Sequence, residues 1–277
     1  MENKTCPIKK TILPNIKHII IVASGKGGVG KSTVAAGIAL SLARQGYATG
    51  LLDADIFGPS VPMLFGLEGQ KPVVEKLNDQ DLFIPFQKFG IRLMSIGFFI
   101  EPQQAVIWRG PRVSSGVTQL LTQTQWGNLD YLIIDTPPGT GDVHITLLQS
   151  FSLSGVVVVT TPQELSLTDV KKAVHLYHDN QIGIPVIGVI ENMAWFTPSL
   201  HPDEKYFLFG KGGGEALARE FNIPMIAQIP INERLCATCD DGQMQELFND
   251  PTVSSAFDQL VNAISNYRFS SYKFIKP

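Results

Sequence analysis

The amino-acid sequence predicts an α/β fold with a doubly wound, mostly parallel sheet that carries helices on both faces. Runs rich in β-branched apolar residues alternate along the chain with longer segments of helical periodicity. Several of these runs are continuously apolar, which is typical of strands that are buried on both faces. Polar motifs follow the ends of successive runs, so a parallel arrangement would gather them at the carboxyl edge of the sheet.

The expected strands and helices follow from these patterns. The strands are Ile19–Ala23, Gly50–Asp53, Ile91–Ile96, Tyr131–Asp135, Gly155–Thr160, Pro185–Glu191 and Met225–Ile229. The helices are Gly30–Gln45, Ser166–Asn180, Gly213–Phe221 and Val253–Asn266. In the second helix, Ser166 and Asp169 have the spacing of a capping box, so we expect the helix to begin there. The chain has no internal repeat, which favours a single domain.

The bulk composition is that of an ordinary globular protein. Of its 277 residues, 44% are hydrophobic and 17% are charged. The formal net charge of −3 argues against a nucleic-acid partner, because phosphate binding relies on clustered Lys and Arg. No apolar run is long enough to span a bilayer, and Met1–Lys10 lacks the apolar core of a secretory signal. We therefore expect a cytoplasmic protein with neither a nucleic-acid nor a membrane partner.

A glycine-rich segment between the first strand and the first helix is the strongest motif. Its residues are Gly25, Lys26, Gly27, Gly28, Val29, Gly30, Lys31, Ser32 and Thr33. Glycines permit turns in which backbone N–H groups point at phosphate oxygens, and the helix N-terminus also favours an anion. In such a P-loop, Lys31 reaches the β- and γ-phosphates and Ser32 is a ligand of Mg²⁺. The alternative, a glycine-rich turn with an accidental Lys-Ser, does not explain the strand, loop and helix together.

The expected ligands are therefore ATP and Mg²⁺, and the expected activity is slow ATP hydrolysis. This interpretation divides the chain into three parts: a flexible N-terminal segment at 1–16, a P-loop ATPase domain at 17–267 and a C-terminal tail at 268–277.

Further polar residues stand at the ends of other expected strands. Asp135 ends an apolar strand and fits the Walker B role, in which it holds Mg²⁺ directly or through water. Gly139–Asp142 then fits a glycine-hinged switch loop that senses the γ-phosphate. Asn192 offers an amide donor and acceptor, which suits an adenine edge. For the acidic residues the alternative is a helix cap or a turn, which is common for a lone Asp.

The second lysine of the P-loop, Lys26, is the mark of the deviant Walker A group, which includes MinD, ParA and the nitrogenase iron protein. Resemblance to that group implies that Lys26 contacts nucleotide bound by the opposing subunit, so a homodimer would complete the site. It also implies that Asp55 positions or activates the attacking water and that Asp53 supports the metal.

Several longer stretches closely resemble the Mrp/ApbC family of iron–sulfur cluster carrier ATPases. They are Asp53–Ser60, Trp108–Pro111, Asp130–Asp142, Thr161–Glu164, Glu191–Met193 and Phe209–Gly210. The resemblance runs from about Lys17 to the C-terminal helix. It implies an ATP-dependent homodimer that holds a 4Fe–4S cluster at the subunit interface, with a cluster scaffold and apo iron–sulfur client proteins as partners.

The sequence departs from this family pattern in two places. Many members carry a small extra domain before the P-loop, and here we expect none. The family also places a C-P-x-C motif shortly after Glu-Asn-Met, where this sequence has Phe196–His201 without a cysteine.

The remaining candidate ligands are Cys236 and Cys239, which follow the last strand and would supply four thiolates in a dimer, the number that an iron–sulfur cluster needs. The alternatives are a small buried apolar residue for Cys236, or a regulatory dithiol for the pair. Cys6 is expected to be incidental. Two other functions stay open. One is a spatial-organising ATPase of the MinD or ParA class, and the other is a family member that has lost cluster binding.

Overall fold

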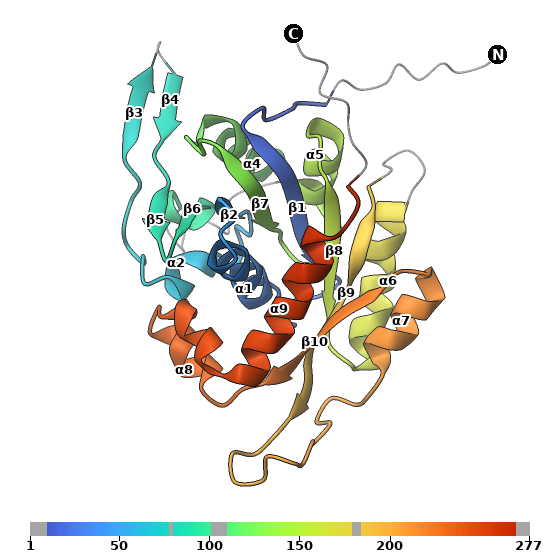
Figure 1. The fold of residues 1–277 in the computed structure, drawn as a ribbon. Coiled ribbons are helices and arrows are strands. Elements are labelled where there is room, and N and C mark those ends of the chain that lie inside the picture. The colour runs from blue at the N-terminus through green and yellow to red at the C-terminus, as the bar shows by residue number, and fades with distance from the viewer. Residues whose placement is uncertain (1–9, 78–79, 101–109, 179–183, 270–277) are drawn as a thin grey trace, which may run out of the picture.

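The computed structural model describes residues 10–77, 80–100, 110–178 and 184–269. It confirms the expected fold class, because a central sheet has the strand order β10-β9-β8-β1-β7-β2-β6-β5 and only β5 runs antiparallel to its neighbour (Figure 1). Its strands are β1 Ile16–Ser24, β2 Thr49–Asp53, β5 Phe86–Lys88, β6 Ile91–Ser95, β7 Leu129–Asp135, β8 Gly155–Thr160, β9 Val186–Phe196 and β10 Met225–Ile231. A separate antiparallel hairpin is formed by β3 Val74–Leu77 and β4 Gln80–Phe83.

Helices cover both faces of the sheet. In Figure 1, α1 and α9 lie together in front of it, whereas the connections between later strands carry α4, α5, α6 and α7. The bounds of the helices are α1 Lys31–Arg44, α2 Val61–Leu64, α4 Gly110–Gln123, α5 Asp142–Ser150, α6 Glu164–His178, α7 Gly213–Phe221, α8 Leu235–Asp240 and α9 Pro251–Ser265, with short 3₁₀ turns at Ile96–Phe98 and Met244–Asn249. None of the helices in the described ranges has the length and apolar character to cross a membrane.

Helices α2, α4, α5 and α8 and strands β3, β4 and β5 were not expected from the sequence, and the bounds of some expected elements differ from those observed. Helix α6 begins at Glu164, two residues before the expected cap, and the hydroxyl of Ser166 instead lies 2.7 Å from that of Thr161. The expected end of this helix, Asn180, lies outside the described residues. Strand β9 continues past Glu191, so Asn192 is part of a strand rather than the residue that follows one.

The sheet brings the polar strand ends together. Strand β7 pairs with β1 on one side and with β2 on the other, in a register that sets Asp135 beside both Val22 and Asp53. These three neighbouring strands are buried along nearly their whole length, because helices cover them on both faces. The P-loop and the acidic residues therefore meet at one carboxyl edge, as the parallel arrangement requires.

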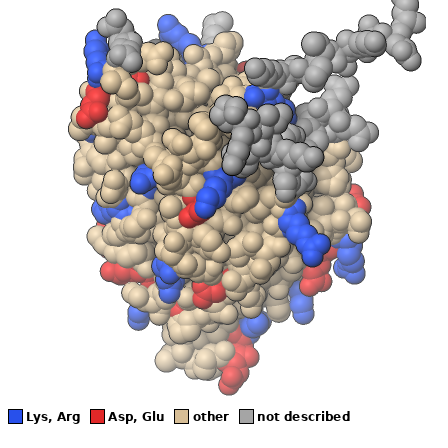
Figure 2. All heavy atoms as spheres, turned by 45° about the horizontal axis from the view of Figure 1, so that its top comes forward, with Lys and Arg blue, Asp and Glu red and all other residues tan. Residues whose placement is uncertain are grey.

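The surface carries its charges in a scattered way on the face shown in Figure 2. Lys and Arg side chains there are spread over the face, several of them next to Asp or Glu, and do not form a continuous basic band.

Candidate nucleotide-binding site

The P-loop connects β1 to α1 through two glycines in the left-handed region. Gly28 has φ 81° and Gly30 has φ 78°, and Gly30 directly precedes the first helical residue, Lys31. The amide nitrogen of Asn192 donates to the carbonyl of Val29 at 2.8 Å, and a Cβ at Gly30 would lie only 2.3 Å from that nitrogen. Gly30 is therefore required both by its backbone conformation and by the close approach of β9.

The first residue of the P-loop, Gly25, packs against helix α6. A Cβ at Gly25 would lie 2.2 Å from the backbone nitrogen of Val170, so the loop touches the backbone of α6 directly. The P-loop is thus fixed between β9 and α6 before any ligand binds. The expected adenine contact of Asn192 stays a prediction, since its amide nitrogen here holds the loop.

Lys31 forms a buried ion pair with Asp135. The ammonium nitrogen lies 2.5 Å from Oδ1 of Asp135, and the two side chains are 7% and 0% exposed. The same ammonium lies 3.4 Å from the hydroxyl of Ser32. Burial raises the pKa of Asp135, and the charge of Lys31 opposes that shift.

The second oxygen of Asp135 fits a metal ligand. Oδ2 is fully buried and has no hydrogen-bond partner within the described part of the chain. A buried carboxylate oxygen left without a donor is costly, and a hard cation or a metal-bound water would satisfy it. Ser32 and Asp135 are therefore the residues that fit Mg²⁺.

Asp53 holds the backbone of the segment that follows β2. Its Oδ1 accepts from the N–H of Asp55 at 3.0 Å, and its Oδ2 accepts from the N–H of Val61 at 3.1 Å and from the hydroxyl of Ser95 at 2.9 Å. Burial and, secondly, the nearby charge of Asp135 raise the pKa of Asp53 to about 7. The observed contacts give Asp53 a role in shaping the switch, and its predicted support of the metal stays a prediction.

Asp55 lies at the edge of a cavity between two candidate switch segments, the first switch at 53–58 after β2 and the second switch at 137–142 after β7. It accepts hydrogen bonds from the N–H groups of Phe57 at 3.1 Å and Gly58 at 3.3 Å, and it is 8% exposed. The cavity has a volume of about 560 Å³, and its walls include Asp55, Gly58, Pro138, Gly141, Asp142 and His144. Because both switches contribute to it, this space would change shape if either segment moved.

Lys26 is half-buried at the start of the P-loop. Its carbonyl accepts from the hydroxyl of Ser24 at 3.0 Å, and no carboxylate in the described ranges forms an ion pair with its ammonium group. The predicted contact with nucleotide across a dimer stays a prediction.

The candidate cysteines lie on the short helix that follows β10. Both belong to α8, where Cys239 is buried and its sulfur lies 3.8 Å from that of Met244. Across the described residues, no group of three or more His, Cys, Asp and Glu side chains could hold a metal ion. The assignment of Cys236 and Cys239 as cluster ligands stays a prediction.

Sequence reasoning missed a buried pair behind the switch. Nε2 of His144 lies 2.9 Å from the carbonyl of Pro137, and Nδ1 lies 2.7 Å from the hydroxyl of Tyr177. Both side chains are fully buried, and burial lowers the pKa of His144 to about 4. His144 stands two residues after the switch motif, which is a usable signal, whereas only the fold brings it to Tyr177.

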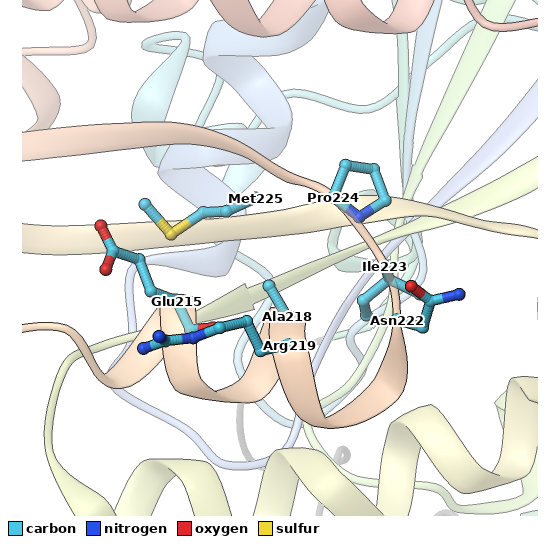
Figure 3. Close-up of a pocket in the computed structure, with 7 residues that line it drawn as sticks. All are labelled: Glu215, Ala218, Arg219, Asn222, Ile223, Pro224 and Met225. Carbon is cyan, nitrogen blue, oxygen red and sulfur yellow. The ribbon is translucent and has the colours of Figure 1, made fainter.

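A second cavity lies away from this site. It has a volume of about 570 Å³ and lies between α7 and the start of β10, with Glu215, Arg219, Asn222 and Met225 among its walls (Figure 3). Because β10 begins there, this cavity is at the amino edge of the sheet, opposite the P-loop.

A glycine-rich loop between β1 and α1, together with a lysine paired to the carboxylate that ends β7, defines a P-loop NTPase. Residues 15–265 match the family model described as ParA, NUBPL iron-transfer P-loop NTPase. The chain therefore belongs to the family of NUBPL-type iron-transfer P-loop NTPases, which confirms the resemblance seen in the motifs.

The relatives and solved structures agree with this family. The iron–sulfur cluster carrier protein of Aquifex aeolicus is 47% identical over 256 residues, which cover 91% of this chain and 68% of the relative. That of Pseudomonas fragi is 47% identical over 232 residues, covering 83% and 79%. A nucleotide-binding protein from Archaeoglobus fulgidus, solved in complex with ADP, superposes with a TM-score of 0.73 at 40% identity and covers 88% of this chain and 93% of its own.

A solved MinD from Pyrococcus horikoshii, complexed with Mg-ADP, has a TM-score of 0.65 at 19% identity, covering 90% of this chain and 96% of its own. At that identity the likeness shows the shared fold alone.

The close approach of Asn192 on β9 to the P-loop predicts that a methyl group added at Gly30 would disturb the loop. We expect Gly30→Ala to weaken ATP binding by at least about tenfold, because it adds backbone strain and displaces Asn192. The matched control is Gly46→Ala, which changes a glycine with φ 90° that has nothing within 4 Å of its Cβ position. Titration calorimetry with ATP should show near wild-type affinity for the control. Equal affinities for the two variants would contradict the prediction.

Proposed function

We propose that this protein is a homodimeric ATPase that carries an iron–sulfur cluster and transfers it to apoproteins in the cytoplasm. Membership of the iron-transfer family is the observation that carries the proposal. The complete P-loop and the Lys31–Asp135 pair support its nucleotide-driven part. The scarcity of cysteines supports a reducing compartment, since three cysteines do not make a disulfide framework.

Nucleotide binding would begin with a change of partner for Lys31. The phosphates of ATP offer the lysine several negative oxygens, so the ammonium group would exchange Asp135 for the β- and γ-phosphates. Asp135 would then be free, with Ser32, to hold Mg²⁺, which supplies charge neutralisation at the phosphates. The glycine N–H groups of the loop would orient the phosphate chain without any large rearrangement, because β9 and α6 already fix the loop.

Hydrolysis would depend on Asp55 and on the two switches. Asp55 borders the cavity that both switches line, and this position supports its role in orienting the attacking water. Gly139 and Gly141 give the second switch the freedom to respond to the γ-phosphate.

A homodimer follows from the role proposed for Lys26. A lysine that completes the partner's site makes each site incomplete in the monomer, and the two contacts are equivalent in a two-fold symmetric pair. ATP would therefore link the subunits, and hydrolysis would release them. Residues near the two-fold axis would come together only in the ATP state.

The cluster is the cargo of this cycle, and its ligands are the least supported part of the proposal. Cys239 packs in the core, so cluster binding would require α8 to turn or shift. The chain just after this helix is in close backbone contact with the residue that follows α2 and its C-cap, because a Cβ at Gly242 would lie 2.4 Å from the backbone nitrogen of Gly66. Gly66 follows α2, whose first residue is held by Asp53, so movement of the first switch would reach α8 through backbone contact. The burial of Cys239 also favours a second candidate, a family member that keeps the nucleotide switch without a cluster.

Removal of the Asp55 carboxylate tests the catalytic part. We expect Asp55→Ala to bind ATP about as tightly as the wild type and to lose about 100-fold or more in hydrolysis rate, because general-base groups contribute that much. Phosphate release and fluorescent-nucleotide binding measure the two effects separately. Lys31→Ala is the control that should lose binding itself. Wild-type turnover in the Asp55 variant would rule out the role proposed for this residue.

If Lys26 contacts the nucleotide of the partner subunit, its removal should prevent dimerisation and leave ATP binding intact. We expect Lys26→Ala to bind a non-hydrolysable ATP analogue and to stay monomeric in light scattering, since the lost charge acts only on the partner's nucleotide. Lys17→Ala is the matched control, because Lys17 pairs with Asp130 near the amino edge and is 69% exposed. The trans contact would be refuted by a Lys26 variant that dimerises with the analogue like the control.

The cysteine pair predicts where a cluster binds. We expect the protein, purified anaerobically or reconstituted, to contain iron and sulfide in equal amounts and to show the broad visible absorption of thiolate-bound iron. The double variant Cys236→Ala/Cys239→Ala should lose both signals and keep ATP binding, whereas Cys6→Ala should keep them. Full loading of the double variant would place the ligands elsewhere. A wild type that never loads would favour the cluster-free switch.

A further inference from the structure

Hydrogen bonds to β1 hold the second switch on both sides of Pro137 and Pro138. The hydroxyl of Thr136 donates to the carbonyl of Val22 at 2.9 Å, and the N–H of Gly139 donates to the carbonyl of Ser24 at 2.8 Å. Pro137 and Pro138 lie between these anchors and have no N–H groups. Only carbonyl groups are therefore available on these two prolines to hold the turn from its other side, and the carbonyl of Pro137 is the one that His144 contacts.

His144 holds that carbonyl and is itself held by Tyr177. A carbonyl oxygen only accepts, so the contact at 2.9 Å requires that Nε2 of His144 carries the proton and donates. Nδ1 is then an acceptor, and it receives the hydroxyl of Tyr177 at 2.7 Å. The bonds form one directed chain from Tyr177 through the imidazole to the switch, and both side chains are fully buried.

Helix α6 contacts the P-loop as well as this chain. The backbone at Val170 lies against Gly25, and Tyr177 follows Val170 by two helical turns, so both stand on one side of the helix. The helix therefore touches the first residue of the P-loop and, through His144, the turn after Asp135. These are the two segments that the Lys31–Asp135 pair joins on the ligand side.

We propose that His144 and Tyr177 are positioning residues for ATP hydrolysis, because their hydrogen-bond chain fixes the second switch relative to α6 and the P-loop. The proposal rests on the proposed ATPase function. The hydrogen bonds of the pair join Tyr177 to His144 and His144 to the carbonyl of Pro137, so we expect their loss to affect the hydrolysis step more than ATP affinity. His144 also forms part of the wall of the cavity that Asp55 borders, so a displaced imidazole would alter the space in which the attacking water is held.

A purely structural role makes different predictions. If the pair only filled the core, removal of one hydroxyl would lower stability and leave turnover per folded molecule unchanged. If the pair positions the switch, the turnover of folded protein falls while ATP affinity is kept. A donor-retaining replacement of His144 would then also outperform an apolar one of similar size.

The first test is the change Tyr177→Phe, which removes one hydroxyl and leaves the ring. We expect kcat to fall about three- to tenfold, the value of one hydrogen bond, with the Kd for ATP within about twofold of wild type. The matched control is Tyr131→Phe, which removes a hydroxyl from a buried tyrosine near the amino end of β7, whose ring lies 5.2 Å from that of His18. We expect the control to keep the wild-type kcat. His144→Gln, which keeps a donor, should retain more activity than His144→Leu.

The second test reads the hydrogen-bond chain without any turnover. Nitrogen NMR of ¹⁵N-histidine protein should show His144 with a protonated Nε2 and a bare Nδ1, and the Nδ1 signal should shift in Tyr177→Phe. The opposite tautomer, or a folded Tyr177→Phe protein with wild-type kcat, would overturn the proposal. Failure of the wild type to hydrolyse ATP would instead overturn the proposed function, and the wild-type assay shows this before any variant is compared.

Discussion

The ion pair between Lys31 and Asp135 is the interaction on which the geometry of the site depends. It joins the first residue of α1 to the last residue of β7, and both charges are buried. Removing either partner of such a pair leaves an uncompensated buried charge and costs about 3–5 kcal/mol. The pair therefore keeps the P-loop and the end of β7 together in the absence of nucleotide. It is also poised for exchange, because phosphate oxygens compete with the carboxylate for the same ammonium group.

The electrostatics of the carboxyl edge explain why a cation belongs there. Asp53 and Asp135 lie opposite each other on neighbouring strands, and neither side chain reaches solvent. Burial and, secondly, the charge of Asp135 raise the pKa of Asp53 to about 7, and burial also raises the pKa of Asp135. Lys31 compensates only one of the two carboxylates. A bound divalent cation would stabilise the ionised form of both, and the unpartnered oxygen of Asp135 is the place from which it would be held.

The sequence is sufficient for those parts of the molecule that depend on local pattern. The continuously apolar runs locate the central strands, and the P-loop glycines locate the nucleotide site, because each signal lies within a short stretch of chain. The hairpin β3–β4 was missed because its residues are mostly exposed and lack the apolar alternation that marks a strand. The roles of Asn192 and Tyr177 depend on which segments become neighbours in the fold. No spacing in the chain indicates that Asn192 reaches Val29 or that Tyr177 reaches His144.

The position of α8, which carries Cys236 and Cys239, also depends on which segments pack together in the fold. The C-x-x-C pair lies on α8, which follows the carboxyl end of β10 and packs against α2, so Cys239 becomes part of the core. A buried thiol is poorly placed to meet a partner subunit, so a cluster site would have to be created by movement. The backbone contact between Gly66 and Gly242 makes such movement dependent on the segment after the first switch. Cargo binding and nucleotide state would then be linked in this chain by the packing of α2 against α8.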